Sequence, residues 1–227
     1  MLFFDPRYLI IVGPAILLAF WAQARVKSAF AKGSKYTARS GLTGAEAARK
    51  ILEANGIMDV SVEAVRGFLS DHYDPRSKTL RLSPAVYQGR SLSSVGVAAH
   101  ETGHAIQDAR HYAPLVLRNG IVPLASTGST LSIIFIIAGA LLALSKLLWV
   151  GVILFAGVVV FQLVNLPVEF DASRRARLVL LNNGMVTQEE DRVVGKVLNA
   201  AAMTYVAATI TAIAQLAYFI LLAGRRS

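Results

Sequence analysis

The sequence predicts a mostly α-helical integral membrane protein, with about four transmembrane helices and one small α+β unit in the cytoplasm. Hydrophobic residues make up 55% of the 227 residues and charged residues only 16%, whereas a soluble domain carries about 25% charged residues. The apolar residues gather in long runs that polar segments separate. The chain has no cysteine, which excludes disulfides and thiolate metal ligands.

Residues 1–24 are predicted to form an N-terminal transmembrane anchor. The apolar run from 8 to 24 is close to the lower limit of about 17 residues for a spanning helix, and Arg25 ends it. The alternative is a cleaved signal peptide. The preceding Asp5-Pro-Arg7 is a weak n-region, and no small-residue cleavage site follows the run, so we favour a retained anchor.

Residues 25–118 are polar and charged, and we predict that they form the cytoplasmic α+β unit. Thr43-Gly-Ala-Glu46 has the spacing of a capping box and predicts a helix over 44–54. Asn55-Gly56 ends this helix. Ser83-Pro84 is typical of another helix start, with Ser at the N-cap and Pro at the first helical position.

Three short strands are expected between these two helix starts. Polar and apolar residues alternate around Val60, Val62 and Ala64, as in a half-buried strand. Residues 67–70 and 79–82 are the other strand candidates. Asp71-His-Tyr-Asp-Pro75 lies between them and is typical of a turn.

A further helix is predicted over residues 93–110. Val95, Ala98, Ala99, Ala105 and Ile106 give it an apolar surface on most sides. This pattern indicates a helix that is buried in protein.

The remaining chain predicts three more membrane spans. Residues 119–166 form a transmembrane hairpin, in which only Ser145-Lys146 separates two apolar runs. Residues 167–196 are polar again, and Thr187-Gln-Glu-Glu190 begins a helix as a capping box does. Residues 197–227 contain the last apolar run, whose complete crossing of the bilayer the sequence leaves open.

The net charge of +9 agrees with a bilayer as the main partner. With four spans, all Lys and Arg except Arg7, Lys146, Arg225 and Arg226 lie on one face. The positive-inside rule places that face in the cytoplasm and predicts a multi-pass protein of the inner (cytoplasmic) membrane. The basic residues form no aromatic-interleaved stripe, so we expect no nucleic-acid partner.

His100-Glu101-Thr-Gly-His104 carries the predicted chemistry. Residues four apart lie on one face of a helix, so the two imidazoles can bind one Zn²⁺ per chain. Glu101 lies about 100° round the helix and can take a proton from a metal-bound water as the catalytic base. Small and apolar residues flank the motif, and unliganded histidines would be costly there.

A catalytic zinc normally has three protein ligands and one open position. His111 is better explained as a polar residue at a helix end, and His72 as a surface turn residue or a group that contacts substrate. We favour Glu169, just after the third span, as the third ligand. Asp171 is its competitor and could instead bind a histidine ring N–H from behind.

Two segments carry a resemblance to a known family. P-V-E-F-D-A-S-R-R-A (residues 167–176) and A-A-H-E-T-G-H-A-I-Q resemble the YugP-like family of membrane-bound neutral zinc metallopeptidases, as does D-H-Y-D-P-R-S-K-T-L-R-L-S (71–83). More distantly, E-F-D-A-S-R looks like the E-F-x-A-D segment of the gluzincins related to the CAAX-prenyl endopeptidase and HtpX. The resemblance implies a zincin-like unit and places the third ligand at Glu169. The Asp of that segment is Ser173 here, so the supporting role is open between Ser173 and Asp171.

We therefore expect a membrane-embedded zinc metalloendopeptidase that cuts membrane proteins or peptides near the cytoplasmic face. Residues 79–82 could offer an edge strand to an extended substrate. One alternative is a zinc-dependent membrane protein that acts on a non-peptide substrate. Another is a non-enzymatic adaptor whose structural zinc is closed by a fourth ligand, Asp171 or His111. The sequence leaves the substrate and the oligomeric state open.

Overall fold

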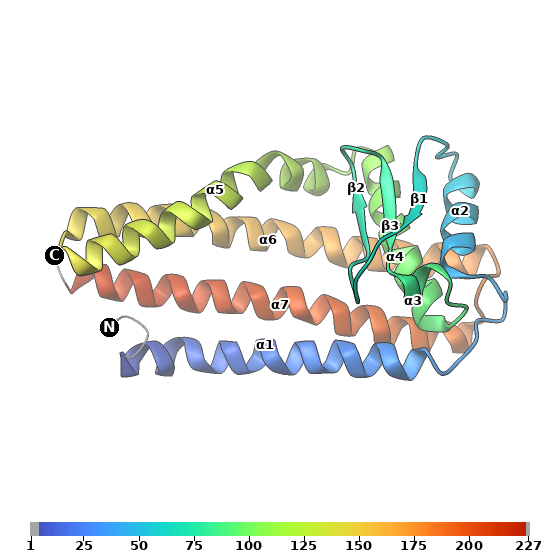
Figure 1. Cartoon of the computed structure of the whole chain (residues 1–227), viewed down its shortest axis with the longest axis horizontal. Coiled ribbons are helices and arrows are strands. Elements are labelled where there is room, and N and C mark those ends of the chain that lie inside the picture. Colours follow the sequence, from blue (N-terminus) through green and yellow to red (C-terminus); the bar gives the residue numbers. More distant parts are fainter. Residues whose placement is uncertain (1–4, 226–227) are drawn as a thin grey trace. The chain divides into compact units, whose positions relative to one another are not determined.

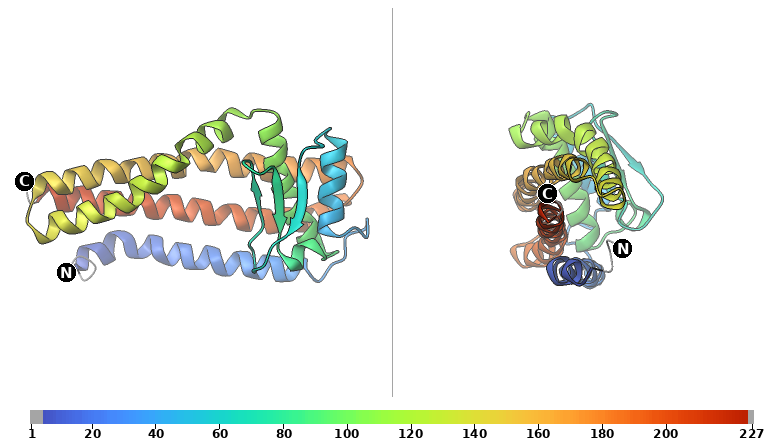
Figure 2. Two further views of the ribbon diagram at one scale, coloured as in Figure 1. Left: turned by 45° about the horizontal axis from the view of Figure 1, so that its top comes forward. Right: turned by 90° about the vertical axis from the view of Figure 1, so that its left-hand side faces the viewer.

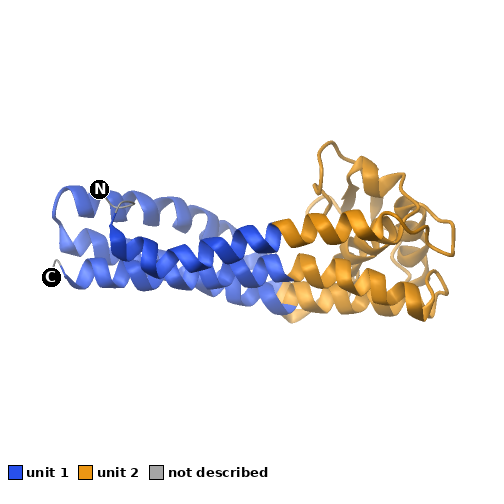
Figure 3. Ribbon diagram, turned by 90° about the horizontal axis from the view of Figure 1, so that it is seen from below, with its two compact units in different colours: residues 1–23, 116–167, 203–227 blue, residues 24–115, 168–202 orange. Residues whose placement is uncertain are grey.

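The computed structural model describes residues 5–225, and it consists of helices and one small sheet (Figure 1). Arg226, which the charge distribution above includes, lies outside the described residues. The chain forms two compact units (Figure 3). Unit 1 comprises residues 1–23, 116–167 and 203–227, and unit 2 comprises residues 24–115 and 168–202.

Four helices are long and apolar enough to cross a membrane, as the sequence predicts. They are α1 (Pro6–Gly33), α5 (Ala113–Leu141), α6 (Ser145–Asn182) and α7 (Gln188–Gly224). Two of them extend well beyond their apolar runs. α6 continues through Pro167 into the polar segment, and the capping box at Thr187 begins the same helix, α7, that carries the last apolar run. The turn between α5 and α6 lies at residues 142–144, before the predicted Ser145-Lys146.

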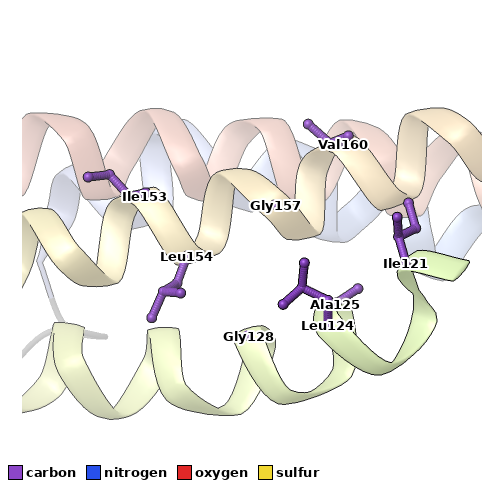
Figure 4. Close-up of a pocket in the computed structure, with 8 residues that line it drawn as sticks. All are labelled: Ile121, Leu124, Ala125, Gly128, Ile153, Leu154, Gly157 and Val160. Atoms are coloured by element: carbon purple, nitrogen blue, oxygen red, sulfur yellow. The ribbon is translucent and has the colours of Figure 1, made fainter.

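Apolar side chains form the core cluster of unit 1. Its core includes Val12 from α1, Ile136 from α5, Phe155 from α6 and Phe219 from α7. A cavity of about 300 Å³ lies between α5 and α6, and Figure 4 shows its lining from both helices. That lining is apolar throughout and includes Gly128 and Gly157.

Unit 2 combines a three-stranded sheet with helices. The strands are β1 (Ser61–Ala64), β2 (His72–Asp74) and β3 (Thr79–Leu82), and they lie side by side (Figure 2). The order is β1-β3-β2, with β1 parallel and β2 antiparallel to β3. Its other elements are α2 (Gly44–Ala54), α3 (Pro84–Tyr87) and α4 (Leu92–Ala109), together with parts of α1, α5, α6 and α7.

The helix predictions in unit 2 are confirmed. α2 begins at the capping box, where Thr43 accepts from the Glu46 backbone and Glu46 accepts from the Thr43 backbone. α3 has Ser83 at its N-cap and Pro84 at its first position. α4 agrees with the predicted helix to within one residue at each end.

Three strand predictions need correction. Residues 67–70 form no strand, because Gly67 and Leu69 have φ values of 121° and 54°, outside the strand region. The expected turn at 71–75 instead contains β2, and the turn follows at 75–78, where the Asp74 carboxylate accepts from the Arg76 backbone and the Ser77 hydroxyl. Residues 79–82 form the central strand, not an edge, and β1 and β2 are the two edge strands.

α4 lies at the centre of unit 2, as its apolar surface predicts. Val95, Ala99 and Ile106 pack in one cluster with residues of α2, α6 and α7. Ala98 packs in a second cluster with Leu80 and Leu82 of β3. The helix is therefore covered by protein on several sides, so its buried polar side chains need hydrogen-bond partners within the protein.

Candidate metal centre

α4 presents His100 and His104 on one face, one turn apart. Their ring centroids are 4.9 Å apart and the ring planes are inclined by 80°. His104 is buried and His100 is partly buried. Two imidazoles in this arrangement can bind a single cation through one nitrogen each.

A glycine lets the opposing helix come close to this face. A Cβ added at Gly103 would lie 2.7 Å from the backbone oxygen of Ala172 in α6. Real side chains do not tolerate that separation from backbone. Gly103 therefore permits the approach of the α6 segment that carries Glu169. This close approach explains why glycine occupies the fourth position of the motif.

Glu169 reaches both histidines. Its Oε2 lies 3.3 Å from His100 Nε2 and 3.6 Å from His104 Nε2. These ligand atoms of the three residues all lie within 4.8 Å of one another, and Glu169 is buried. The structure thus brings together the three predicted ligands from two helices, although Glu169 follows the histidines by 65 or more positions in the sequence.

The donor set fits a zinc ion. Ligands at about 2.1 Å from a tetrahedral ion are separated from one another by about 3.4 Å. The two nitrogen–oxygen distances of 3.3 and 3.6 Å agree with that separation. Two imidazoles and one carboxylate are also the ligand set of known catalytic zinc sites, which keep a fourth position open.

Glu101 lies beside this group without belonging to it. Burial, together with the charges of Glu169 and Asp71, raises the pKa of its carboxyl to about 7. His100 and the backbone N–H of Tyr73 in β2 act in the opposite direction. A bound cation would also favour the carboxylate. Glu101 is therefore a buried carboxyl that can exchange a proton near neutral pH.

Buried polar groups support His104 from behind. Its Nδ1 lies 3.0 Å from Oε1 of Gln107, and Gln107 Nε2 donates to Asp171 Oδ2 at 2.9 Å. Asp171 also accepts from Arg174 and Arg175. Asp171 is thus engaged behind the site and reaches His104 through an amide instead of by direct contact.

His100 has a different supporting group. Its Nδ1 lies 3.1 Å from the Ser173 hydroxyl. Of the two residues that the sequence leaves open for a supporting role, Ser173 lies beside the His100 ring, and Asp171 is linked to the His104 ring through Gln107.

Known proteins resemble this chain over nearly its whole length. Residues 8–224 match the family described as "Putative neutral zinc metallopeptidase". The "Putative membrane protease YugP" of Bacillus subtilis (strain 168) is 49% identical over 208 residues, which cover 92% of each chain. The chain belongs to this zinc metallopeptidase family. No solved structure matches it.

Membership of the zinc metallopeptidase family supports zinc as the cation of the site. When bound, zinc lowers the pKa of a coordinated water toward about 7 and polarises a carbonyl oxygen. His100, His104 and Glu169 are the residues that would hold it.

The other two histidines lie elsewhere. His72 is exposed in β2, and its Nδ1 bonds to the Ser70 carbonyl oxygen at 2.8 Å. His111 lies in the turn after α4 with a φ of 49°. Neither belongs to the group of three donors that the described residues form.

Gln107 is the site residue that the sequence analysis missed. It is completely buried and lies three positions after His104, so it occupies the same face one turn further along α4. That spacing is the sequence signal that could have indicated a role for Gln107. The role itself depends on Asp171 and the Val168 carbonyl, which bind the Gln107 amide in the structure.

Proposed function

We propose that this protein is a membrane-embedded zinc metalloendopeptidase with Glu101 as its catalytic base. The observation that carries the proposal is the meeting of His100, His104 and Glu169 at ligand-like separations beside a buried Glu101. Family membership supports the same chemistry. The small α+β unit around α4 would be the zincin-like part of the molecule.

A group of three protein donors would leave a zinc ion one position for water or substrate, which favours a catalytic over a structural role. A structural site is closed by four protein ligands. Within residues 5–225 the donor group contains three members. Asp171, one expected fourth ligand, is engaged by Gln107, Arg174 and Arg175 instead. These facts speak against the adaptor alternative.

Glu101 supplies the proton transfers in this proposal. Its carboxylate accepts a proton from the attacking water and then delivers it to the nitrogen of the leaving amine. Glu101 lies on α4 beside β2, and its burial suits this role, because a carboxyl pKa near neutral allows the group both to accept and to donate a proton. His100, His104 and Glu169 would hold the cation.

We place the active site on the cytoplasmic side, with membrane proteins or membrane-bound peptides as substrates. The distribution of Lys and Arg supports this orientation. β2 pairs with β3 and, among the described strands, has no neighbour on its other side. Because the Tyr73 backbone N–H lies beside Glu101, an extended peptide paired with β2 would run past the proposed base.

Metal analysis and hydrolysis of unfolded membrane polypeptides by the purified full-length protein test the proposal. The wild type should contain about one zinc per chain and cut the substrate. His104→Ala should lose the metal. Glu101→Gln should keep the metal, whereas its hydrolysis should fall by at least about 100-fold, the usual contribution of a general base.

Each result has a clear converse. Full hydrolysis by Glu101→Gln would remove Glu101 from its assigned role. A zinc-loaded wild type that hydrolyses a lipid and no polypeptide would favour the non-peptide alternative. Zinc retained by His104→Ala would contradict the metal site itself.

A further inference from the structure

Gln107 has an unusual environment for a side chain that is not among the candidate ligands. It is fully buried on α4 and has three polar partners from two helices. Its Oε1 lies 3.0 Å from His104 Nδ1. Its Nε2 lies 2.9 Å from both the Val168 carbonyl oxygen and Asp171 Oδ2. Every polar atom of the amide therefore has a partner.

These partners fix the orientation of the amide. A carbonyl oxygen and a carboxylate oxygen can only accept hydrogen bonds, so the NH₂ group must face Val168 and Asp171. The amide oxygen then faces His104, and an oxygen there can only accept. His104 Nδ1 must therefore carry the hydrogen, which leaves the lone pair on Nε2, the nitrogen that faces Glu169.

Asp171 holds this arrangement in place. It is buried, and its carboxylate accepts from Arg174 and Arg175 as well as from Gln107. Arg175 in turn lies over the ring of Tyr112, 5.4 Å from its centroid. The amide is thus anchored on α6, the helix that also carries Glu169.

We infer that Gln107 is a positioning residue of the metal site, which selects the metal-binding tautomer of His104 and links its orientation to Asp171. This inference rests on the proposed function, because it assumes that His104 binds a metal. It adds a residue to which neither the motif nor the family description gives a role.

The two histidines differ in how strictly their tautomers are set. His100 Nδ1 faces the Ser173 hydroxyl at 3.1 Å, and a hydroxyl can donate or accept. Ser173 therefore orients the His100 ring without choosing its tautomer. Only the amide of Gln107, held by two acceptors, excludes one tautomer.

Zinc affinity of the full-length protein, measured by competition with a chelator, tests the inference directly. Gln107→Leu keeps the approximate size of the side chain and removes the acceptor for His104. We expect a loss of about 10–100-fold in affinity, the usual effect of removing a partner behind a metal ligand. Ser93→Ala is the matched control, because it removes a buried hydrogen bond that α4 donates to the Phe30 carbonyl, outside the motif. Its affinity should be that of the wild type.

An exchange of the amide and the carboxylate distinguishes positioning from packing. Gln107→Glu keeps an acceptor for His104, but it places a second carboxylate against Asp171, so the affinity should fall. Adding Asp171→Asn returns an N–H donor to the pair and should restore at least about tenfold of the lost affinity. A residue that only fills space would show no such rescue.

The outcomes distinguish failure of the proposed metal site from failure of the inference about Gln107. A wild type that binds no zinc overturns the metal site and the inference together. Zinc binding by the wild type with equal affinity in Gln107→Leu, or the absence of rescue in the double variant, overturns the inference alone. Selective ¹⁵N labelling of the four histidines supplies an independent readout: the metal-free wild type should show His104 protonated at Nδ1, and Gln107→Leu should show both tautomers.

Discussion

The two compact units bury different kinds of side chain. Unit 1 has an apolar core, and its buried polar residues are Ser132, Asn165 and Thr209. The buried acids and the buried histidine of the described chain all lie in unit 2: Glu101, His104, Glu169, Asp171 and Asp191. Buried charges are expensive unless they are paired or bind a metal. Arginines pair with Asp171 and Asp191. The cost of burying His104 and Glu169 together is the one that a bound metal would offset.

The comparison predicts different responses to substitution. In unit 1 an apolar side chain contributes through its size and hydrophobicity, which many residues can supply. In unit 2 the position of individual nitrogen and oxygen atoms matters, because each has a specified partner. The following experiments test that contrast.

Replacing the third ligand should have the largest effect. Glu169→Ala removes the carboxylate oxygen that faces both histidines. We expect zinc affinity to fall by more than about 100-fold, beyond the usual effect of removing a supporting partner. Phe170→Ala, whose half-exposed side chain follows Glu169 on α6, is the control and should bind zinc normally. Equal zinc affinities in the two variants, measured by chelator competition, would contradict the role of Glu169 as a ligand.

Metal removal should destabilise the protein. A ligand present at about 100 times its Kd stabilises the folded state by about 2.7 kcal/mol. Thermal unfolding in detergent should therefore occur at a lower temperature with a chelator than with added zinc. His104→Ala should unfold at the same temperature in both conditions. A zinc-dependent shift that persists in this variant would place the stabilising ion elsewhere.

Two glycines allow a matched test of packing. Gly103→Ala forces a Cβ against the Ala172 backbone oxygen and should cost about 1–3 kcal/mol in stability, together with some zinc affinity. Gly157→Ala in unit 1 places its Cβ where no atom lies within 4 Å. That change should alter stability by about 1 kcal/mol or less. Equivalent unfolding temperatures for the two variants would show that α4 and α6 need no close approach.

Tyr73→Phe should have the smallest effect of the series. The Tyr73 hydroxyl donates to Asp108 Oδ2 at 2.7 Å and joins β2 to α4, while Lys78 also donates to that oxygen. Loss of the bond should cost about 1 kcal/mol without changing zinc affinity.

The same bond has a pH dependence of known sign. Burial and the bond to Asp108 raise the pKa of Tyr73 above its ordinary value. The stability it contributes is therefore complete below about pH 10 and declines as the pH rises further. Denaturant unfolding of both proteins at neutral and alkaline pH measures this, and a difference that grows with pH would contradict the assignment.

Much of this architecture could be predicted from local sequence. Long apolar runs predict the four membrane-length helices, and the capping boxes at Thr43 and Thr187 predict helix starts, because each signal depends only on neighbouring residues. The short strands were less predictable. Two positive φ values around Gly67 interrupt an apparent strand, and the pairing of β2 with β3 decides which strand lies at the edge.

The metal centre likewise combines residues that local sequence predicts with one that depends on tertiary packing. The spacing of His100 and His104 predicts a shared helix face, and the absence of cysteine leaves histidine and carboxylate side chains as candidates for the third ligand. The role of Gln107 could not be predicted in this way. It depends on contacts with Val168 and Asp171, which are more than 60 positions away and reach α4 only through tertiary packing.

X-ray absorption at the zinc edge of the purified full-length protein tests the central claim most directly. The account predicts a first shell of nitrogen and oxygen atoms at about 2.0–2.2 Å, with the scattering of two imidazoles. The imidazole contribution should fall or disappear in His104→Ala. A shell with no imidazole, or one unchanged in that variant, would contradict the account.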